Sequence, residues 1–376
     1  MTSYLFSAPG RTEICGNHTD HQHGCVLAAA VNLETVAEVV LIEEPVIRIF
    51  SEGYAPVAVE LDDLDVRQEE KNTTAGLVRG VAAAFRQRGA KLKGFRANVR
   101  STVLPGSGLS SSAAFEVLIG TILNELFFYK RLTAVEIAQI GQYAENVYFG
   151  KPCGLMDQTA SSVGGMVFID FKDPAKPLVE KVEFDFESAG HGLCIIDCGA
   201  DHANLTDEYA AIPGELRSLC ALFGKEVLRD IPQETFFSGL PAIRGKVPDR
   251  AILRAIHFYQ ENARVQQQVA ALKANDFPTF LRLVKASGRS SWMYLQNITP
   301  AGETMHQDMA LALAMCDTLL GDAGAYRVHG GGFAGTVQAF VPVEMLESFR
   351  GGMEAVFGAG SCHVLSVRSS GGVRLQ

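Results

Sequence analysis

The chain is organised around residues 104–116, which read LPGSGLSSSAAFE. Gly106 and Gly108 allow the backbone to turn tightly and to approach a ligand closely. A helix that begins near Ser110 to Ser112 would point its unpaired amide groups back towards this loop, and an anion such as a phosphate is the natural occupant. A plain turn before a serine-capped core helix explains the same letters, so this stretch alone leaves both interpretations open.

The spacing of this stretch excludes two common nucleotide-binding loops. No lysine follows the last glycine, as the common P-loop requires, and Ser111 stands where the dinucleotide-binding pattern needs a glycine. A strict capping box is also absent, because Phe115 and not an acid lies three residues after Ser112. If the stretch holds a phosphate, it does so as a loop of another class.

Length and composition describe a globular, soluble protein. A chain of 376 residues with 47% hydrophobic content suggests about two domains with real cores. The formal net charge of −9, without a basic tract, argues against nucleic acid or an anionic membrane as a main partner. The N-terminus lacks the pattern of a cleaved leader and no long apolar run occurs, so we expect a cytoplasmic protein. The eight cysteines lie mostly in apolar surroundings and are expected to be free thiols.

A polar loop interrupts two apolar, strand-like segments near the N-terminus. It reads GRTEICGNHTDHQHG and holds more hydrogen-bonding side chains than a turn needs: Arg11, Asn17, His18, Asp20, His21 and His23. Three histidines beside an aspartate are compatible with a metal site, but no partner cluster of ligands stands elsewhere in the sequence. Recognition of a small polar ligand is the better explanation.

The remaining pattern predicts the elements that carry further polar groups. Helices are expected over 72–88 and over 133–149, the second with Thr133 as its N-cap and Glu145 near its end, and a strand over 95–103 leads into the Gly/Ser stretch. Asp157 follows a Gly-Leu-Met turn, so it is either a helix cap or a functional carboxylate. Helices are expected from about 206 to 321, followed by YRVHGGGFAGTVQAFV, which predicts two strands around a glycine-rich turn.

Three motifs in this order resemble those of the GHMP small-molecule kinases: the N-terminal polar loop, PGSGLSSSAA, and GGGFAG near the C-terminus. Within that superfamily, APGRTEICGNHTDHQHG and KPCGLMDQ are similar to the sugar-binding and catalytic-aspartate segments of the galactokinase family, and the likeness covers nearly the whole chain. It implies an α+β fold of two domains, expected over 1–200 and 201–376. These would be a ribosomal-protein-S5-like N-terminal domain and a ferredoxin-like C-terminal domain, with the active site in the cleft between them.

The resemblance also implies a chemistry, the ATP-dependent phosphorylation of the C1 hydroxyl of galactose with Mg²⁺ as the metal. It implies Asp157 as the catalytic carboxylate with Arg11 as its basic companion, and Ser112 with Glu145 as the Mg²⁺ ligands. The residues expected to contact the sugar are Asn17, His18, Asp20, Gly154 and Tyr209. The residues expected to hold the ATP phosphates are Gly106, Ser107, Gly108, Leu109, Ser110, Ser111 and Ser112.

The chain departs from the family pattern at Asn17. Galactokinases typically carry Glu before the His-Thr-Asp run, where the acid meets the C6 end of galactose. An amide would repel a C6 carboxylate less, so galacturonate is a rival substrate, with N-acetylgalactosamine as another. A non-catalytic sensor of sugar is the alternative from a different class. The sequence does not specify the oligomeric state, the adenine pocket, or whether Asp157 acts as a full general base.

Overall fold

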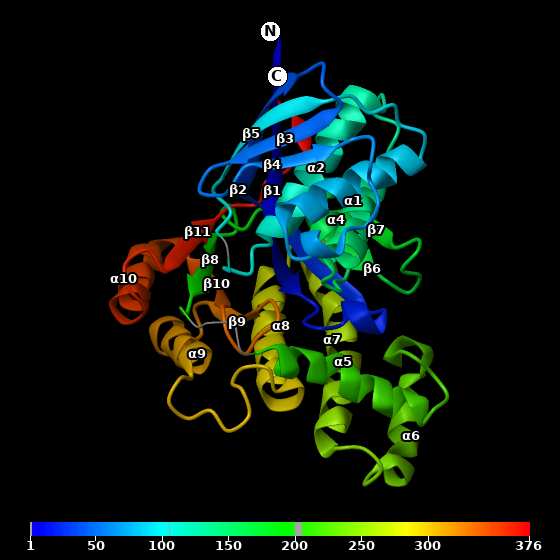
Figure 1. The fold of residues 1–376 in the computed structure, drawn as a ribbon. Helices are drawn as coiled ribbons and strands as arrows, with labels where there is room; N and C mark the ends of the chain where they lie inside the picture. Colours follow the sequence, from blue (N-terminus) through cyan, green and yellow to red (C-terminus); the bar gives the residue numbers. More distant parts are fainter. Residues whose placement is uncertain (1, 105, 200–204) are drawn as a thin grey trace.

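The computed structural model describes residues 2–104, 106–199 and 205–376, and within these ranges the strands form two sheets (Figure 1). The first sheet has the order β12-β1-β2-β5-β3-β4, with β6 beside β2 and β7 beside β6. Its strands are β1 (Ser3–Cys15), β2 (Cys25–Leu41), β3 (Val46–Ser51), β4 (Val57–Glu60), β5 (Phe95–Ser101), β6 (Met166–Asp170), β7 (Leu178–Val182) and β12 (Val373–Arg374). The second sheet has the order β11-β8-β10-β9, with β8 (His191–Asp197), β9 (Ala325–His329), β10 (Thr336–Pro342) and β11 (Cys362–Leu365).

Two long antiparallel strands form the centre of the first sheet. β1 and β2 pair from Ser3 opposite Val40 to Cys15 opposite Leu27, with register shifts on either side of Arg11. The first half of β2 also pairs with β6 and its second half with β5. The predicted polar loop was too long at its start, because residues 10–15 with Arg11 belong to β1. The polar loop of the structure is residues 16–24, which connect β1 to β2 at the end of this ribbon. β12 pairs with β1, which brings the two ends of the chain close together (Figure 1).

Four helices pack with the first sheet, and they confirm the local predictions. They are α1 (Thr74–Gln87), α2 (Ser111–Phe127), α3 (Ala134–Tyr143) and α4 (Met156–Val163). Thr133 caps α3 with a full capping box, in which its side chain accepts from the Glu136 amide and the Glu136 side chain accepts from the Thr133 amide. The helix continues as a π-helical segment, Ala144–Phe149, as the predicted length over 133–149 requires.

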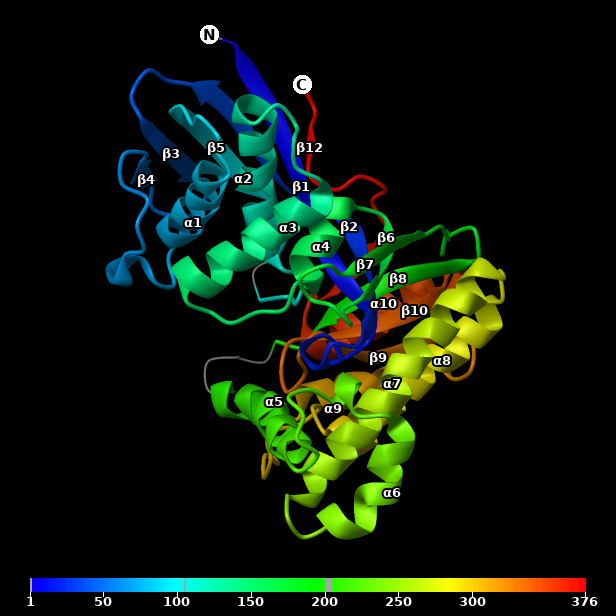
Figure 2. The ribbon, with the colours of Figure 1, turned by 90° about the vertical axis from the view of Figure 1, so that its right-hand side faces the viewer.

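Helices cover both faces of the second sheet (Figure 2). α7 (Asp249–Lys273) and α8 (Phe277–Ser290) pack on one face, and α9 (Asp308–Leu320) and α10 (Leu346–Phe357) on the other, while α5 (Thr206–Ala221) and α6 (Gln233–Ile243) pack against α7. Neighbouring residues of β10 serve the two sides, because Phe340 joins the α7–α8 core and Ala339 the α9–α10 core. The predicted helical region over 206–321 and the strand–turn–strand after it are confirmed.

The predicted division into residues 1–200 and 201–376 does not coincide with the two sheets, because one strand from each half pairs in the sheet of the other half. β8 lies before residue 200, yet it pairs with β10 and β11 in the second sheet. β12 lies at the other end of the chain and pairs in the first sheet. An apolar strand such as GLCIID does not indicate its partner, so the division at residue 200 stays a prediction, and by sheet membership β8 goes with the second half.

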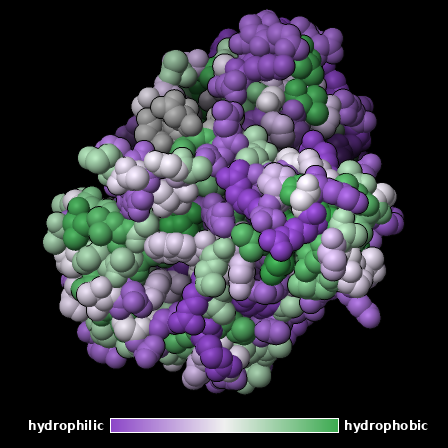
Figure 3. Space-filling view, turned by 90° about the horizontal axis from the view of Figure 1, so that it is seen from below, coloured by the Kyte–Doolittle hydropathy of each residue, from purple (hydrophilic) through white to green (hydrophobic). Residues whose placement is uncertain are grey.

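The outer surface mixes residue types. Hydrophilic and hydrophobic residues are interspersed over the face shown in Figure 3. In the described ranges, no helix has the length and apolar character needed to cross a membrane.

Candidate active site

The Gly/Ser loop, residues 106–112, lies where a strand becomes a helix, as predicted. Gly106 and Gly108 have φ angles of 77° and 69°, a left-handed conformation that favours glycine. The loop is held from both halves of the molecule. The Leu109 carbonyl accepts from the Arg11 amide at 3.0 Å, and the Ser107 carbonyl accepts from Thr336 Oγ1 at 3.2 Å. This loop therefore faces a boundary between the first sheet and the β9–β10 hairpin.

Ser110 precedes α2 but does not cap it with its side chain. Its backbone is left-handed, with φ 59° and no side-chain cap hydrogen bond. Its hydroxyl instead donates to Asp157 Oδ2 at 2.6 Å. The serine-cap interpretation is therefore wrong for Ser110, and the first amide groups of α2 remain oriented towards the loop, where an anion suits them.

Asp157 lies in the first turn of α4, where it forms a bidentate pair with Arg11. Its Oδ1 accepts from Arg11 Nε and its Oδ2 from Arg11 Nη2, both at 2.6 Å. Burial acts to raise the pKa of Asp157, but the charge of Arg11 and the hydrogen bonds from Arg11 and Ser110 outweigh it, so the pKa is lowered from its ordinary value. Asp157 is therefore ionised at neutral pH. It is not the helix cap, because the N-cap residue of α4 is Leu155.

A cavity of about 290 Å³ brings these groups together. Its lining comes from the Gly/Ser loop, from the α3–α4 region and from the glycine turn after β9, and it includes Arg11, Gly106, Gly108, Ser110, Ser111, Ser112, Glu145, Lys151, Asp157, Gly330, Gly331 and Thr336. The amide end of α2 favours an anion there, whereas the cations of Arg11 and Lys151 are paired with Asp157 and Glu145. The Gly/Ser loop and Asp157, which were both predicted as site residues, therefore line the same cavity.

Glu145 lies at this cavity within a buried carboxyl network. Its Oε2 accepts from Gln158 Nε2 at 2.9 Å, and the same nitrogen donates to Glu116 Oε2 at 3.0 Å. Burial first, and then the charge of Glu145, raises the pKa of Glu116 well above its ordinary value. Sequence reasoning missed both Glu116 and Gln158. The available signal was that Glu116 stands four residues after Ser112, on the same face of α2.

These side chains fit a Mg²⁺ ion that is shared with a substrate. Mg²⁺ is usually held by one or two carboxylates together with substrate phosphates and waters. Glu145 and Ser112 both line the cavity, and nearby Glu116 Oε1 is buried without a hydrogen-bond partner. Across the described ranges, no group of three or more His, Cys, Asp or Glu residues is placed to hold a metal alone.

The polar loop meets the glycine turn, residues 330–332. His18 Nε2 donates to the carbonyl of residue 331 at 2.8 Å, and the Tyr209 hydroxyl donates to the carbonyl of residue 332 at 2.8 Å. Burial, followed by the neighbouring His21, lowers the pKa of His18 to about 3, so this imidazole is neutral. Asp20 packs against Gly154, where a methyl group would overlap Asp20 Oδ2.

Asn17 differs from these residues because it is enclosed by protein. It is 0% exposed. Its Nδ2 donates to the Gly330 carbonyl at 2.6 Å and to Glu13 Oε1 at 3.3 Å. Its Oδ1 accepts from Asn297 Nδ2 at 2.8 Å and from Ser291 Oγ at 3.3 Å. Two donors and two acceptor positions are all that an amide offers, so Asn17 has no capacity left for the predicted sugar contact.

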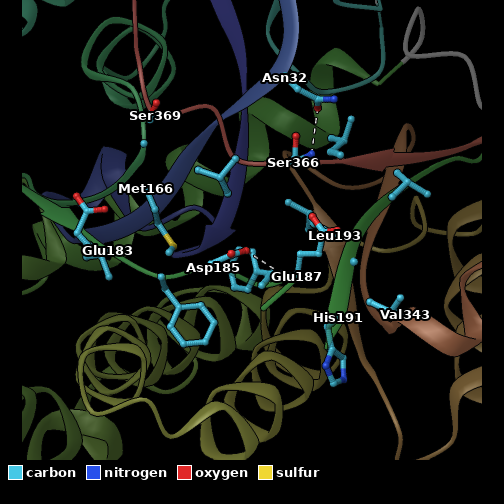
Figure 4. A pocket seen from close by; sticks show the side chains of 18 of the residues that line it. Asn32, Met166, Glu183, Asp185, Glu187, His191, Leu193, Val343, Ser366 and Ser369 are labelled. Carbon is cyan, nitrogen blue, oxygen red and sulfur yellow. Dashed lines mark hydrogen bonds between the residues drawn. The ribbon is translucent and has the colours of Figure 1, made fainter. Parts of the chain in front are cut away.

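A separate cavity of about 520 Å³ lies away from these residues (Figure 4). Met166, Leu193 and Val343 contribute apolar side chains to it, and Asn32 Oδ1 accepts from the Ser366 amide at 3.1 Å beside it. None of the predicted site residues lines this cavity, so the chemistry belongs to the smaller one.

The two-sheet fold, with a Gly/Ser loop at the start of α2 beside the Asp157–Arg11 pair, is that of the GHMP small-molecule kinases. Residues 76–165 match the family model for the GHMP kinases N terminal domain. The structure of Methanococcus jannaschii mevalonate kinase has the same fold, with a TM-score of 0.69, 14% sequence identity, and coverage of 97% of this chain and 98% of that chain.

Within this class, the chain belongs to the galactokinase family. Residues 2–40 match the galactokinase galactose-binding signature. A galactokinase of Streptomyces coelicolor is 31% identical over 358 residues, which cover 94% of this chain and 89% of the relative. The structure of Lactococcus lactis galactokinase complexed with galactose is similar, with a TM-score of 0.84, 24% identity, and coverage of 99% of this chain and 95% of that one. Membership of this family makes the protein an ATP-using sugar kinase.

Proposed function

We propose that this protein is a galactokinase, which transfers the γ-phosphoryl group of ATP to the C1 hydroxyl of galactose. The observation that carries the proposal is that Asp157, paired with Arg11, and the Gly/Ser loop line one cavity of about 290 Å³. A phosphate at the loop and a hydroxyl beside the carboxylate would be close enough to react in such a space.

Asp157 and Arg11 carry the proposed chemistry. A sugar hydroxyl is a poor nucleophile, so Asp157 accepts its hydrogen bond, orients it for in-line attack and takes the proton as the new bond forms. Because the pKa of Asp157 is lowered, it is a weak base before the reaction starts. Orientation and charge therefore contribute more than basicity, and Arg11 stabilises the negative charge that develops on the oxygen.

The donor side of the proposed site extends beyond the Gly/Ser loop. The loop and the amide end of α2 hold the phosphates of ATP. Ser111 and Ser112 also line a second cavity of about 390 Å³, whose wall mixes polar side chains with an apolar part that suits the adenosine: Tyr54, Leu77, Val99, Val103 and Phe115. Ser112 and Glu145 would hold Mg²⁺, which when bound neutralises charge on the phosphates.

The acceptor side consists of Asp20 and Gly154, flanked by His18 and Tyr209, whose side chains also hydrogen-bond to the glycine turn. The two carboxylate oxygens of Asp20 suit a pair of adjacent sugar hydroxyls, and a wrong epimer would leave one oxygen unpaired. We leave Asn17 out of this set, because its amide is fully used inside the protein. The case for galacturonate depended on a contact with Asn17, so galactose is the substrate we propose.

The cysteines support a reducing compartment. All eight are unpaired, and seven of them are buried. We therefore propose the cytoplasm as the location, since free thiols persist there.

A substrate panel tests the function. Purified protein with Mg·ATP is given galactose, galacturonate, N-acetylgalactosamine or arabinose, ADP release is followed, and the product is examined by phosphorus NMR. We expect galactose to have the highest kcat/KM and to yield the 1-phosphate. Turnover of another sugar in preference to galactose would overturn the substrate. Binding of galactose without turnover of any sugar would favour the sensor alternative.

A further inference from the structure

The glycine turn, residues 330–332, is held by a side chain at each of its three carbonyl oxygens. Asn17 Nδ2 donates to the carbonyl of residue 330 at 2.6 Å, and Asn297 Nδ2 to that of residue 331 at 3.1 Å. The Tyr209 hydroxyl donates to that of residue 332 at 2.8 Å. A turn without side chains has few packing contacts of its own, so these hydrogen bonds determine where its backbone lies.

Asn17 and Asn297 form one unit within this arrangement. Both are 0% exposed, and Asn297 Nδ2 donates to Asn17 Oδ1 at 2.8 Å. The main chain takes part too, because the Asn297 carbonyl accepts from the Phe333 amide at 2.6 Å. A methyl group at Gly332 would overlap the Asn297 carbonyl, so the backbones approach as closely as glycine permits. The pair therefore holds the carbonyls of residues 330 and 331, and the Asn297 carbonyl holds the Phe333 amide that follows the turn.

The glycine turn is also a wall of the proposed active site. Gly330 and Gly331 line the cavity of about 290 Å³ that holds Asp157. The strand that follows the turn begins with Thr336, whose hydroxyl bonds the Ser107 carbonyl of the Gly/Ser loop at 3.2 Å. A shift of the turn would therefore displace His18 on the sugar side, which is bonded to a carbonyl of the turn, and the Gly/Ser loop on the phosphate side, which is bonded to Thr336.

We propose that Asn17 and Asn297 are positioning residues, an uncharged amide clamp that fixes the glycine turn between the sugar side and the phosphate side. They act through the backbone of the turn and do not touch the sugar. The inference deepens the proposed galactokinase activity and rests on it for its kinetic consequences. In this chain the two amides suit the turn because it presents carbonyl oxygens, which accept from their Nδ2 groups. An acid at position 17 would place a negative charge against the Gly330 carbonyl and beside Glu13, whose Oε1 is 3.3 Å from Asn17 Nδ2.

Isosteric substitutions test the clamp without relying on activity. Asn297→Asp and Asn17→Asp keep the side-chain shape and remove the donors. Asn124→Asp is the matched control, since Asn124 is 6% exposed and exchanges two hydrogen bonds of 3.1 Å with Leu132, away from the turn. Hydrogen exchange followed by mass spectrometry should show faster exchange over residues 330–335 in both Asp variants and unchanged exchange there in the control. Unchanged exchange in the turn of the Asp variants overturns the clamp. If either Asp variant does not fold, the corresponding Ser variant takes its place.

Kinetics then separate positioning from direct contact. We expect each Asp variant to lower kcat with galactose by about tenfold or more, because small misplacements in an active site have large effects. Because Thr336 links the turn to the Gly/Ser loop, the KM for ATP should rise together with the KM for galactose in both variants, and combining the two substitutions should add little, since both disrupt the same pair. A rise in the KM for galactose confined to the Asn17 variant would overturn the clamp in favour of a sugar contact. If the wild type fails to phosphorylate galactose while the Asp variants loosen the turn, the clamp stands and the galactokinase proposal fails.

Discussion

Replacing Asp157 by asparagine preserves the shape of the side chain and removes its charge. Three hydrogen bonds of 2.6 Å, two from Arg11 and one from Ser110, converge on this carboxylate. The amide nitrogen of the variant would face at least one of these donors, so one bond is lost and Arg11 loses its counter-charge. Loss of a positioned proton acceptor costs about 10²–10⁴-fold in rate, or about 2.7–5.4 kcal/mol of transition-state stabilisation.

The effect of Asp157→Asn on folding should be much smaller than its effect on rate. Breaking a buried ion pair costs about 3–5 kcal/mol, but the Asp157 side chain is 31% exposed, so solvent screening reduces this to about 1–2 kcal/mol. Arg11 also keeps its hydrogen bond to the Gly108 carbonyl. The variant should therefore remain folded and should bind ATP normally.

The assay for Asp157→Asn measures kcat at saturating galactose and Mg·ATP, with ATP affinity by calorimetry and a thermal melt as controls. We expect kcat to fall by at least about 100-fold while the Kd for ATP changes by less than about threefold. Retention of more than about a tenth of the wild-type kcat would refute the role of this carboxylate. A parallel loss of ATP binding would show instead that the substitution damages the phosphate site.

Four further changes follow from the same geometry. Ser110→Ala removes one of the bonds that lower the pKa of the catalytic carboxylate, so the acidic limb of the pH profile of kcat should move to higher pH; an unmoved limb would contradict this. Glu145→Gln should raise the Mg²⁺ concentration needed for half-maximal rate by about tenfold or more with little change in the KM for galactose, as a metal titration would show. Gly154→Ala should raise the KM for galactose, because the added methyl group displaces Asp20, whereas an unchanged KM would exclude Asp20 from the sugar site. The pKa of His18 is about 3 in the folded protein and 6.5 in the free side chain, so the unfolded chain takes up this proton first as the pH falls. The free energy of unfolding should therefore decrease below pH 6.5. In His18→Asn, denaturant titrations at about pH 7 and pH 5 should show a smaller decrease.

Local chemistry explains which parts of the fold were predictable. Thr133 and Glu136 stand three residues apart and form their capping box with no help from the rest of the chain. The strand before the Gly/Ser loop and the helix after it follow from the period of apolar residues in the same way. The placement of Arg11, Asp157 and Glu145 in one cavity came from the resemblance between motifs, since no periodicity links residues so far apart.

Tertiary hydrogen bonds explain the errors at the site. Serine before a helix is a good cap by local rules, but the Ser110 hydroxyl has a stronger acceptor in Asp157, which lies 47 positions away. Asn17 is a polar residue in a loop and therefore has the features of a ligand-binding side chain. Its hydrogen bond with Asn297, which is 280 positions away in the sequence, shows that it bonds within the protein. Neither pairing leaves a local mark in the sequence. Side chains that bind a ligand and side chains that hold the ligand-binding backbone are the same polar types, so only coordinates separate them.

An acidic chain with a net charge of −9 must create its own favourable place for a polyphosphate. In the cavity, the carboxylate of Asp157 is balanced by Arg11, and Lys151 Nζ lies 3.8 Å from Glu145 Oε1. Behind them, burial and the charge of Glu145 raise the pKa of Glu116 well above its ordinary value, which disfavours a further negative charge there. With the side-chain charges matched, the amide end of α2 is left as an uncompensated positive field, and it points at the Gly/Ser loop. The proposed phosphate site therefore depends on backbone dipoles more than on unpaired cations. Such a site does not require a cluster of Lys and Arg, which agrees with the lack of a basic tract in the sequence.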